Sequence, residues 1–302
     1  MTSYHKQPIM TAFFNSVVLY LMVATSSATF AQQPIHIDTA SVTKHGPERG
    51  SLLIIGGNVG ETPSVWNKFV SLAGGRDKAK IVVVTAAVGD SAAYDQKDIE
   101  LIKKITGIKS VTLLHTGSLS EANSERFIKP IQQATGVYFL GGRQWRIADA
   151  YLNTLTHQAF NDVLKRGGVI AGSSAGASIQ GSFLWRGDTS GPDILVGDHT
   201  QGLGFLKNSA IDQHLLKRNR QFDLVDFIRS SPKLIGIGLD EATAVVVQKD
   251  TLEVVGKSYV AIYDHDTIVK KNIPFVLLQS GQSYDLKNRK IIAPVKTPKT
   301  AQ

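Results

Sequence analysis

Short apolar runs alternate with segments of helical periodicity between residues 50 and 181. Five runs are predominantly apolar and close on glycine or another small residue, as buried strands do: 51–57, 79–87, 110–117, 136–142 and 167–174. Between them, apolar residues recur at helical spacing in 62–75, 98–107, 124–136 and 147–168. This alternation predicts an α/β fold with a mostly parallel central sheet and helices on both faces.

Beyond residue 181 the pattern changes to shorter strand-like segments, at 182–187, 233–240, 243–248, 252–264 and 274–279. Several can pair, with 248–251 as one turn, and they predict additional β-hairpins in the C-terminal third. No linker or internal repeat interrupts the pattern. We therefore predict one α/β domain over 50–280, preceded by a polar N-terminal arm at 32–49 and followed by a basic C-terminal tail at 281–302.

The first 31 residues have the features of a signal peptide. Lys6 is their only Lys or Arg, and they contain no acidic residue. An apolar stretch at 17–24 precedes small residues at Thr29 and Ala31, which frame a cleavage site after Ala31. The stretch is shorter than the roughly 20 residues that span a bilayer. We predict a signal peptide at 1–31, a periplasmic or secreted protein, and no stable membrane insertion after cleavage; an uncleaved anchor is the alternative.

The composition is that of a globular protein, with 42% hydrophobic and 19% charged residues among 302. The chain contains no cysteine, which excludes disulfides and a thiol nucleophile. The formal charge is +8, and removal of 1–31 leaves 32 basic and 25 acidic residues, or +7. Because the basic residues are scattered, we expect no nucleic-acid partner, whereas an anionic substrate is compatible with the surplus.

The segment "GSSAG" at 172–176 carries the strongest chemical signal in the chain. It fits G-x-S-x-G with Ser174 at the centre, after an apolar strand and before small residues that can open a helix. This is the context of a nucleophile elbow, in which Gly172 and Gly176 leave room for a strained turn. The N–H of Ala175 would then face a developing oxyanion, and Ser173 would pack or hydrogen-bond locally. A glycine-serine turn without chemistry is the alternative.

Two other glycine-rich turns follow predicted strands. "GGNVGE" at 56–61 lacks the spacing of a dinucleotide-binding loop, so we interpret it as a tight turn that lines a pocket. "GGRQW" at 141–145 leaves backbone N–H groups unshielded, which suits an oxyanion hole as well as any sharp turn.

A serine nucleophile needs a nearby base and an acid that orients it. His214 ends an apolar strand, where α/β sheets place functional residues, and His199 is the alternative base. Asp240 and Glu241 end another strand, and either could be the acid. No histidine has the spacing of a metal site, so we expect neither a metal nor a cofactor.

Together, "FLGGRQWRIADA", "GSSAGAS", "DQHLLKRNR" and "GIGLDEATA" resemble the cyanophycinase-like serine peptidases over residues 50–265. These are relatives of the α-aspartyl dipeptidases on a class I glutamine amidotransferase-like fold. The resemblance implies Ser174 as nucleophile, His214 as base and Glu241 as acid, an order that differs from that of α/β-hydrolases. It also implies an oxyanion hole from Gly142 and Ala175, and positions near the substrate at Gln144, Asp212, Gln213, Arg218 and Arg220.

The chain departs from this family at two positions near the expected substrate. Asp223 stands where cyanophycinases tend to have a further arginine, and Arg143 where many relatives have a smaller polar or acidic residue. The resemblance implies an exported serine exopeptidase that cleaves peptide or isopeptide bonds at aspartyl residues, as in β-Asp-Arg substrates. Its partner would be a peptide with aspartyl or free carboxylate groups, with Arg218 and Arg220 as candidate carboxylate ligands. An α-aspartyl dipeptidase and a non-catalytic binding protein are the alternatives, and the sequence leaves a homodimer open.

Overall fold

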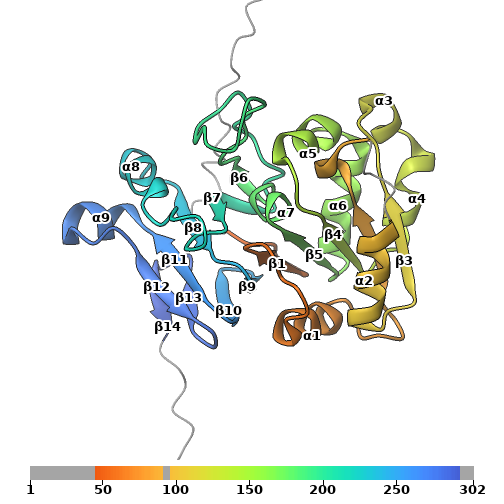
Figure 1. Cartoon of the computed structure of the whole chain (residues 1–302), viewed down its shortest axis with the longest axis horizontal. Helices are drawn as coiled ribbons and strands as arrows, with labels where there is room; N and C mark the ends of the chain where they lie inside the picture. Colours follow the sequence, from red (N-terminus) through yellow and green to blue (C-terminus); the bar gives the residue numbers. More distant parts are fainter. Residues whose placement is uncertain (1–44, 91–95, 293–302) are drawn as a thin grey trace, which may run out of the picture. The chain divides into compact units, whose positions relative to one another are not determined.

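The computed structural model describes residues 45–90 and 96–292. The predicted signal peptide, residues 32–44 of the predicted arm and residues 293–302 lie outside the described residues. A parallel block of five strands forms the centre, in the order β1(Ser51–Ile55), β5(Val169–Ser173), β4(Gly136–Phe139), β2(Lys80–Val84) and β3(Ser110–Leu114) (Figure 1). These are the strands that the apolar runs predict, so the parallel sheet of the predicted α/β fold is confirmed.

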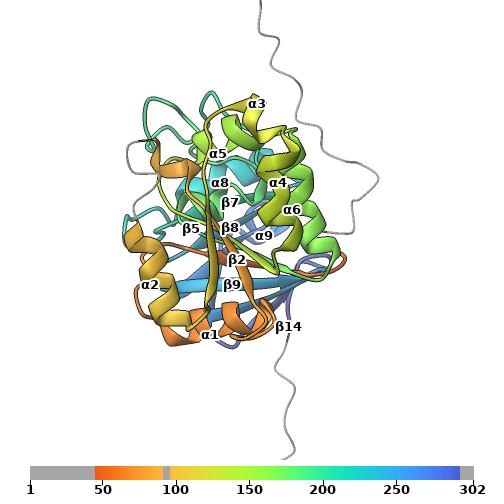
Figure 2. The same cartoon turned by 90° about the vertical axis from the view of Figure 1, so that its right-hand side faces the viewer.

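Helices cover both faces of this block because its strands are apolar on both sides. α1(Pro63–Leu72) and α2(Gln96–Thr106) bury one face, where Trp66 stacks on Tyr138 with ring centroids 5.5 Å apart. α4(Glu125–Gln133) and α6(Leu155–Lys165) pack side by side on the other face (Figure 2). The shorter helices are η2(Ala86–Val88), α3(Leu119–Ala122), α5(Gln144–Tyr151) and α7(Ala175–Ser178).

Four antiparallel strands extend the same sheet beyond β1, in the order β9(Thr243–Gln248), β10(Thr251–Gly256), β13(Ser283–Asp285) and β14(Lys290–Ile292). The β9–β10 hairpin turns at Lys249 and Asp250, as the sequence predicts. The predicted basic tail at 281–302 is wrong over its first part, because β13 and β14 belong to the sheet. Tyr284 and Leu286 are buried in its core, residues 286–289 form the turn between these strands, and Lys290 begins β14.

A second, five-stranded sheet was not expected. Its order is β12(Val276–Gln279), β11(Tyr259–Tyr263), β8(Ile235–Leu239), β7(Leu206–Gln213) and β6(Gly181–Phe183). One face joins the core of the first sheet through Ile211, Ile237 and Ile262. The other face packs against α8(Asp223–Ser230) and α9(His265–Lys271), which lie outside these strands in Figure 1. The strands therefore divide between two packed layers.

The described end of the predicted arm is attached to the domain. His45 is buried, its N–H donates to Asp250, and its Nδ1 lies 3.1 Å from the Lys207 carbonyl. Burial lowers the pKa of the His45 imidazole. Over residues 45–90 and 96–292, no helix combines the length and apolar character needed to cross a membrane.

Candidate active site

The site forms where four strands of the two sheets end. β1 and β5 are parallel neighbours, and Ile55 pairs with Ser173 at their carboxyl ends. β7 and β8 are parallel neighbours in the second sheet, and Gln213 pairs with Leu239 there. The residues that follow these ends face one another, because parallel strands present their carboxyl ends at one edge.

Ser174 sits at a strained turn between β5 and α7. Its φ of 57° and ψ of −114° fall in a region that non-glycine residues rarely adopt. A Cβ on Gly172 would lie 2.2 Å from the Gly176 carbonyl oxygen, and one on Gly176 would lie 2.2 Å from the Phe139 oxygen. Both glycines are therefore required by the close approach of strand and helix, which is the steric reason that the sequence motif suggests.

Ser174, His214 and Glu241 form a continuous hydrogen-bonded chain. Ser174 Oγ and His214 Nε2 are 2.9 Å apart, and His214 Nδ1 and Glu241 Oε1 are 2.7 Å apart. An ionised carboxylate only accepts hydrogen bonds, so the proton lies on Nδ1. Nε2 is then left to accept the hydrogen bond of the Ser174 hydroxyl. This is the arrangement that a serine nucleophile and its base require.

The surroundings favour a neutral imidazole beside an ionised carboxylate. Burial lowers the pKa of His214 below its ordinary 6.5, the charge of Arg218 adds to this effect, and the bond to Glu241 opposes it. A hydrogen bond from Asn58 lowers the pKa of Glu241, and the bond to His214 acts in the same direction. His214 is therefore in the form that can accept a proton at neutral pH.

Gly141 lies beside Ser174, and Gly142 follows it at a sharp turn. A Cβ on Gly141 would be 3.3 Å from the Ser174 Cβ, and one on Gly142 would be 2.3 Å from the Ala87 oxygen, at a φ of 138°. The Gly142 and Ala175 N–H groups have no backbone or side-chain acceptor within the described part of the chain. Two such donors beside the nucleophile can bind an oxyanion.

The residues expected near the substrate differ in how far they can reach it. Gln144 is buried, and its amide donates to the Trp185 and Arg186 carbonyls at 2.9 and 2.7 Å. Asp212 is fully buried, and its carboxylate accepts from Arg186 and from the Trp185 indole. The Gln144 amide nitrogen and the Asp212 carboxylate are therefore bonded within the protein, where they support the wall of the site.

Of the remaining expected residues, Gln213 is buried as the last residue of β7, and Arg218 and Arg220 follow this strand. Arg220 is buried and donates to the Gln213 carbonyl at 3.1 Å, and Arg218 is exposed. Both guanidinium charges act to lower the pKa of His214. Arg143 and Asp223, at which the chain departs from the family, also bond within the protein. Arg143 donates to the Asp188 carbonyl at 2.9 Å, and Asp223 forms an ion pair with Arg186.

The alternative base His199 and the alternative acid Asp240 have other partners. His199 lies between Asp149 and Asp198, with its ring nitrogens 2.8 and 2.7 Å from their carboxylates. Asp240 accepts from the Leu216 and Lys217 N–H groups and from the Ser258 hydroxyl, so it fixes the turn after β8. Glu241 is the acid that meets His214.

Two participants were missed by sequence reasoning. Asn58 Nδ2 donates to Glu241 Oε2 at 2.9 Å across 183 residues of sequence. Its position in a glycine-rich turn after a strand was the available signal, although we expected only a pocket lining. Arg186, which binds Asp212 through two nitrogens, had no signal in its local sequence.

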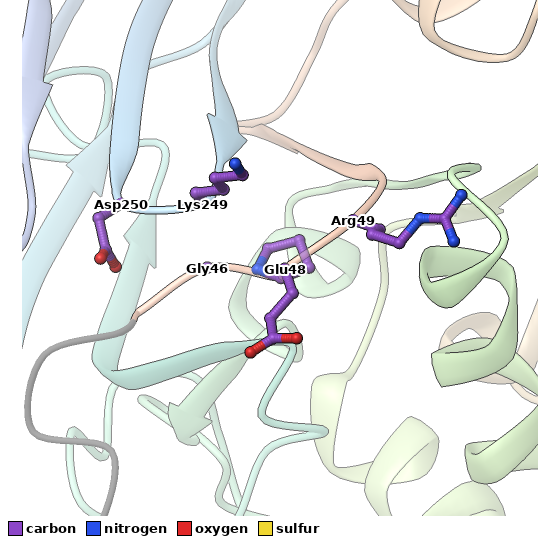
Figure 3. A pocket seen from close by; sticks show the side chains of 6 residues that line it. Gly46, Glu48, Arg49, Lys249 and Asp250 are labelled. Atoms are coloured by element: carbon purple, nitrogen blue, oxygen red, sulfur yellow. The ribbon is translucent and has the colours of Figure 1, made fainter.

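A pocket lies away from this site, near the amino end of β1. Its volume is about 390 Å³, and Figure 3 shows the charged residues Glu48, Arg49, Lys249 and Asp250 around it. Leu52 pairs with Val247 and Ile55 with Ala244, so the Lys249–Asp250 turn adjoins the amino end of β1. No cluster of three or more His, Cys, Asp or Glu side chains suited to a metal ion occurs among residues 45–90 and 96–292.

Comparisons with known proteins agree with the geometry. The cyanophycinases of Geminocystis herdmanii and Synechococcus elongatus are each 27% identical, over 82% and 85% of this chain and 97% and 86% of their own lengths. A peptidase structure from an acI-B1 actinobacterium superimposes with a TM-score of 0.60 at 23% identity, over 80% of this chain and 98% of its own. The structure of a putative peptidase E from Listeria monocytogenes superimposes with a TM-score of 0.52 at 13% identity, over 70% of this chain and 100% of its own.

The sequence resemblance to cyanophycinase-like peptidases is thereby confirmed, and the two solved structures share the fold. Residues 52–255 match the sequence model of peptidase family S51, and this range contains all four strand ends of the site. The chain therefore belongs to peptidase family S51.

Proposed function

We propose that this protein is a serine-type peptidase in which Ser174 is the nucleophile, His214 the general base and Glu241 the acid that orients the base. The observation that carries the proposal is the continuous chain of hydrogen bonds, 2.9 Å from Ser174 to His214 and 2.7 Å from His214 to Glu241. The strained turn at Ser174 supports it as well, because such conformations gather at functional sites.

The reaction would proceed through an acyl-enzyme. His214 Nε2 takes the proton of the Ser174 hydroxyl while the oxygen attacks the scissile carbonyl. The N–H groups of Gly142 and Ala175 stabilise the oxyanion, and the imidazolium then gives its proton to the leaving amine as the C–N bond breaks. Water attacks the ester with His214 again as base, which releases the acid and restores the serine.

We propose peptide or isopeptide bonds at aspartyl residues as the substrate, with β-Asp-Arg as the preferred type and exopeptidase action. Several relatives at 27–29% identity are named cyanophycinases. Arg218 and Arg220 follow His214 closely in the chain, and guanidinium binds carboxylates in a bidentate manner, so both are candidate ligands for a substrate carboxylate. Export rests on residues 1–31 alone, through the apolar stretch and the small residues before position 32.

The test compares Ser174→Ala with Ser173→Ala, its neighbour in the same motif. Wild type and Ser173→Ala should be labelled by a serine-directed phosphonate and should cleave β-Asp-Arg polymer, whereas Ser174→Ala should do neither, with a loss of about 10⁴-fold or more in kcat. Cleavage of α-aspartyl dipeptides in place of the polymer would identify the alternative activity. If the folded wild-type protein is neither labelled nor active on either substrate, the remaining alternative is a non-catalytic binding protein.

A further inference from the structure

Four consecutive residues, from the last residue of β1 onward, each bond a different part of the site. Residues 55–57 do so through backbone carbonyls, and Asn58 does so through its side chain. The bonds are Ser174 N–H to Ile55 O (3.0 Å), His214 N–H to Gly56 O (2.8 Å), Ala242 N–H to Gly57 O (3.0 Å) and Asn58 Nδ2 to Glu241 Oε2 (2.9 Å). The segment 55–58 thus links the ends of β5, β7 and β8.

The backbone part of this segment holds residues in unfavourable conformations. Ser174, His214 and Ala242 have φ values of 57°, 53° and 53°. Such conformations persist only where their surroundings enforce them, and the three carbonyls of 55–57 supply one restraint for each. A Cβ on Gly57 would lie 2.3 Å from His214 Cε1, so the imidazole packs directly on the backbone of this segment.

Asn58 completes the arrangement at the carboxylate. Glu241 uses Oε1 for His214 and Oε2 for Asn58. Its side chain is 20% exposed, and no other side chain of the described residues bonds Oε2. Without the Asn58 amide, water would solvate that oxygen and the carboxylate would be free to rotate away from the imidazole.

We propose that Asn58 is a positioning residue of the peptidase reaction, which holds the Glu241 carboxylate in bonding reach of His214. The proposal rests on the proposed function, and Asn58 acts only through Glu241 without touching substrate. The same hydrogen bond lowers the pKa of Glu241, so it also keeps the carboxylate ionised.

The first test is Asn58→Gly, which removes the amide alone because glycine tolerates the φ of 39° at this position. We expect kcat to fall about 10-fold or more with KM within about 2-fold, since the lost bond orients the base and binds no substrate. Asn272→Gly is the matched control: Asn272 is exposed after α9 and has a φ of 54°, and its replacement should leave kcat unchanged.

The second test is Asn58→Asp, which keeps the shape of the side chain but replaces the donor with an anionic acceptor. A further negative charge near His214 favours the imidazolium, so the acidic limb of kcat/KM should move to higher pH by about half a unit or more. A carboxylate introduced at a position remote from the imidazole would not move this limb. Wild-type kcat in Asn58→Gly overturns the proposal, and so does a wild-type limb in Asn58→Asp.

A titration of His214 by NMR separates this proposal from the proposed function. In the Ser174→Ala background, Asn58→Asp should raise the His214 pKa by a similar half unit. If wild type neither cleaves peptides nor is labelled at Ser174, the proposed function fails, and this titration still decides the effect of Asn58 on its own. An unchanged His214 pKa in an otherwise active enzyme contradicts only the role of Asn58.

Discussion

At the residue scale, the site combines strained backbone conformations with lowered pKa values at His214 and Glu241. Ser174, His214 and Ala242 have positive φ values, each of which costs on the order of 1–3 kcal/mol relative to relaxed backbone. Burial lowers the pKa of His214, while Glu241 is kept ionised by its two hydrogen-bond partners. The fold therefore sustains a strained backbone geometry that these residues would not adopt in a flexible chain, and it extends to lower pH the range in which His214 is neutral and Glu241 is ionised.

The ionisation leads to a prediction about pH. Only the neutral imidazole can accept the Ser174 proton, so activity is lost as pH falls through the His214 pKa. Because that pKa is lowered from 6.5, the acidic limb of wild-type kcat/KM should lie below pH 6.5. Glu241→Gln removes a charge that raises this pKa, and should move the limb still lower while reducing kcat by about 10²- to 10⁴-fold.

The measurement is kcat/KM between about pH 5 and 8, where histidine titrates. Glu253→Gln is the control, because Glu253 lies on β10 in a partly exposed pair with Lys68 and should leave the profile unchanged. A limb that moves upward in Glu241→Gln would show that the carboxylate does not stabilise the imidazolium.

At the element scale, the segment between β6 and β7 is fastened to β7 by a buried ion pair. Arg186 binds both oxygens of Asp212 at 2.9 and 3.0 Å, and neither side chain is more than 3% exposed. Asp212 also accepts from the Trp185 indole at 3.1 Å. Gln144 donates hydrogen bonds to the carbonyls of Trp185 and Arg186. These bonds join the segment to α5, which follows the turn at Gly141 and Gly142.

Removal of the guanidinium should be costly for folding. Arg186→Met leaves the Asp212 carboxylate buried without its main partner, and we expect a loss of about 3–5 kcal/mol in the free energy of unfolding. Lys165→Met breaks the exposed pair with Asp162 and should cost less than about 1 kcal/mol. Denaturant unfolding of both variants checks this, and equal losses would mean that the buried pair contributes no more than the surface one.

The sequence predicts elements well where the signal is local. The motif around Ser174 identifies its turn because Gly172 is required by a contact with Gly176, four residues along the chain. The bond from Asn58 to Glu241 spans 183 residues and the pair of Arg186 with Asp212 spans 26, so neither has a local signature. Strand-like segments after residue 181 are equally recognisable, but nothing local tells β8 from β9, which lie in different sheets.

At the scale of the whole molecule, the site depends on two sheets meeting at one edge. Ser174 follows β5 of the first sheet, whereas His214 and Glu241 follow β7 and β8 of the second. The residues after β1 bridge the two, since Gly56 donates to the Thr243 carbonyl and accepts from the His214 N–H. The domain therefore has to be considered as one packed body up to its last strands.

The C-terminal strands β13 and β14 belong to this packed domain, so substitutions near them should affect its stability. Leu286 is fully buried in the main core and its N–H donates to the Asp250 carbonyl at 2.8 Å, although the sequence suggested a basic tail from 281. Leu286→Ala should therefore cost about 2–5 kcal/mol in the free energy of unfolding. Ile291→Ala, at a position 45% exposed on β14, should cost less than about 1 kcal/mol. Thermal and denaturant unfolding distinguish the two, because a true tail would tolerate both substitutions equally.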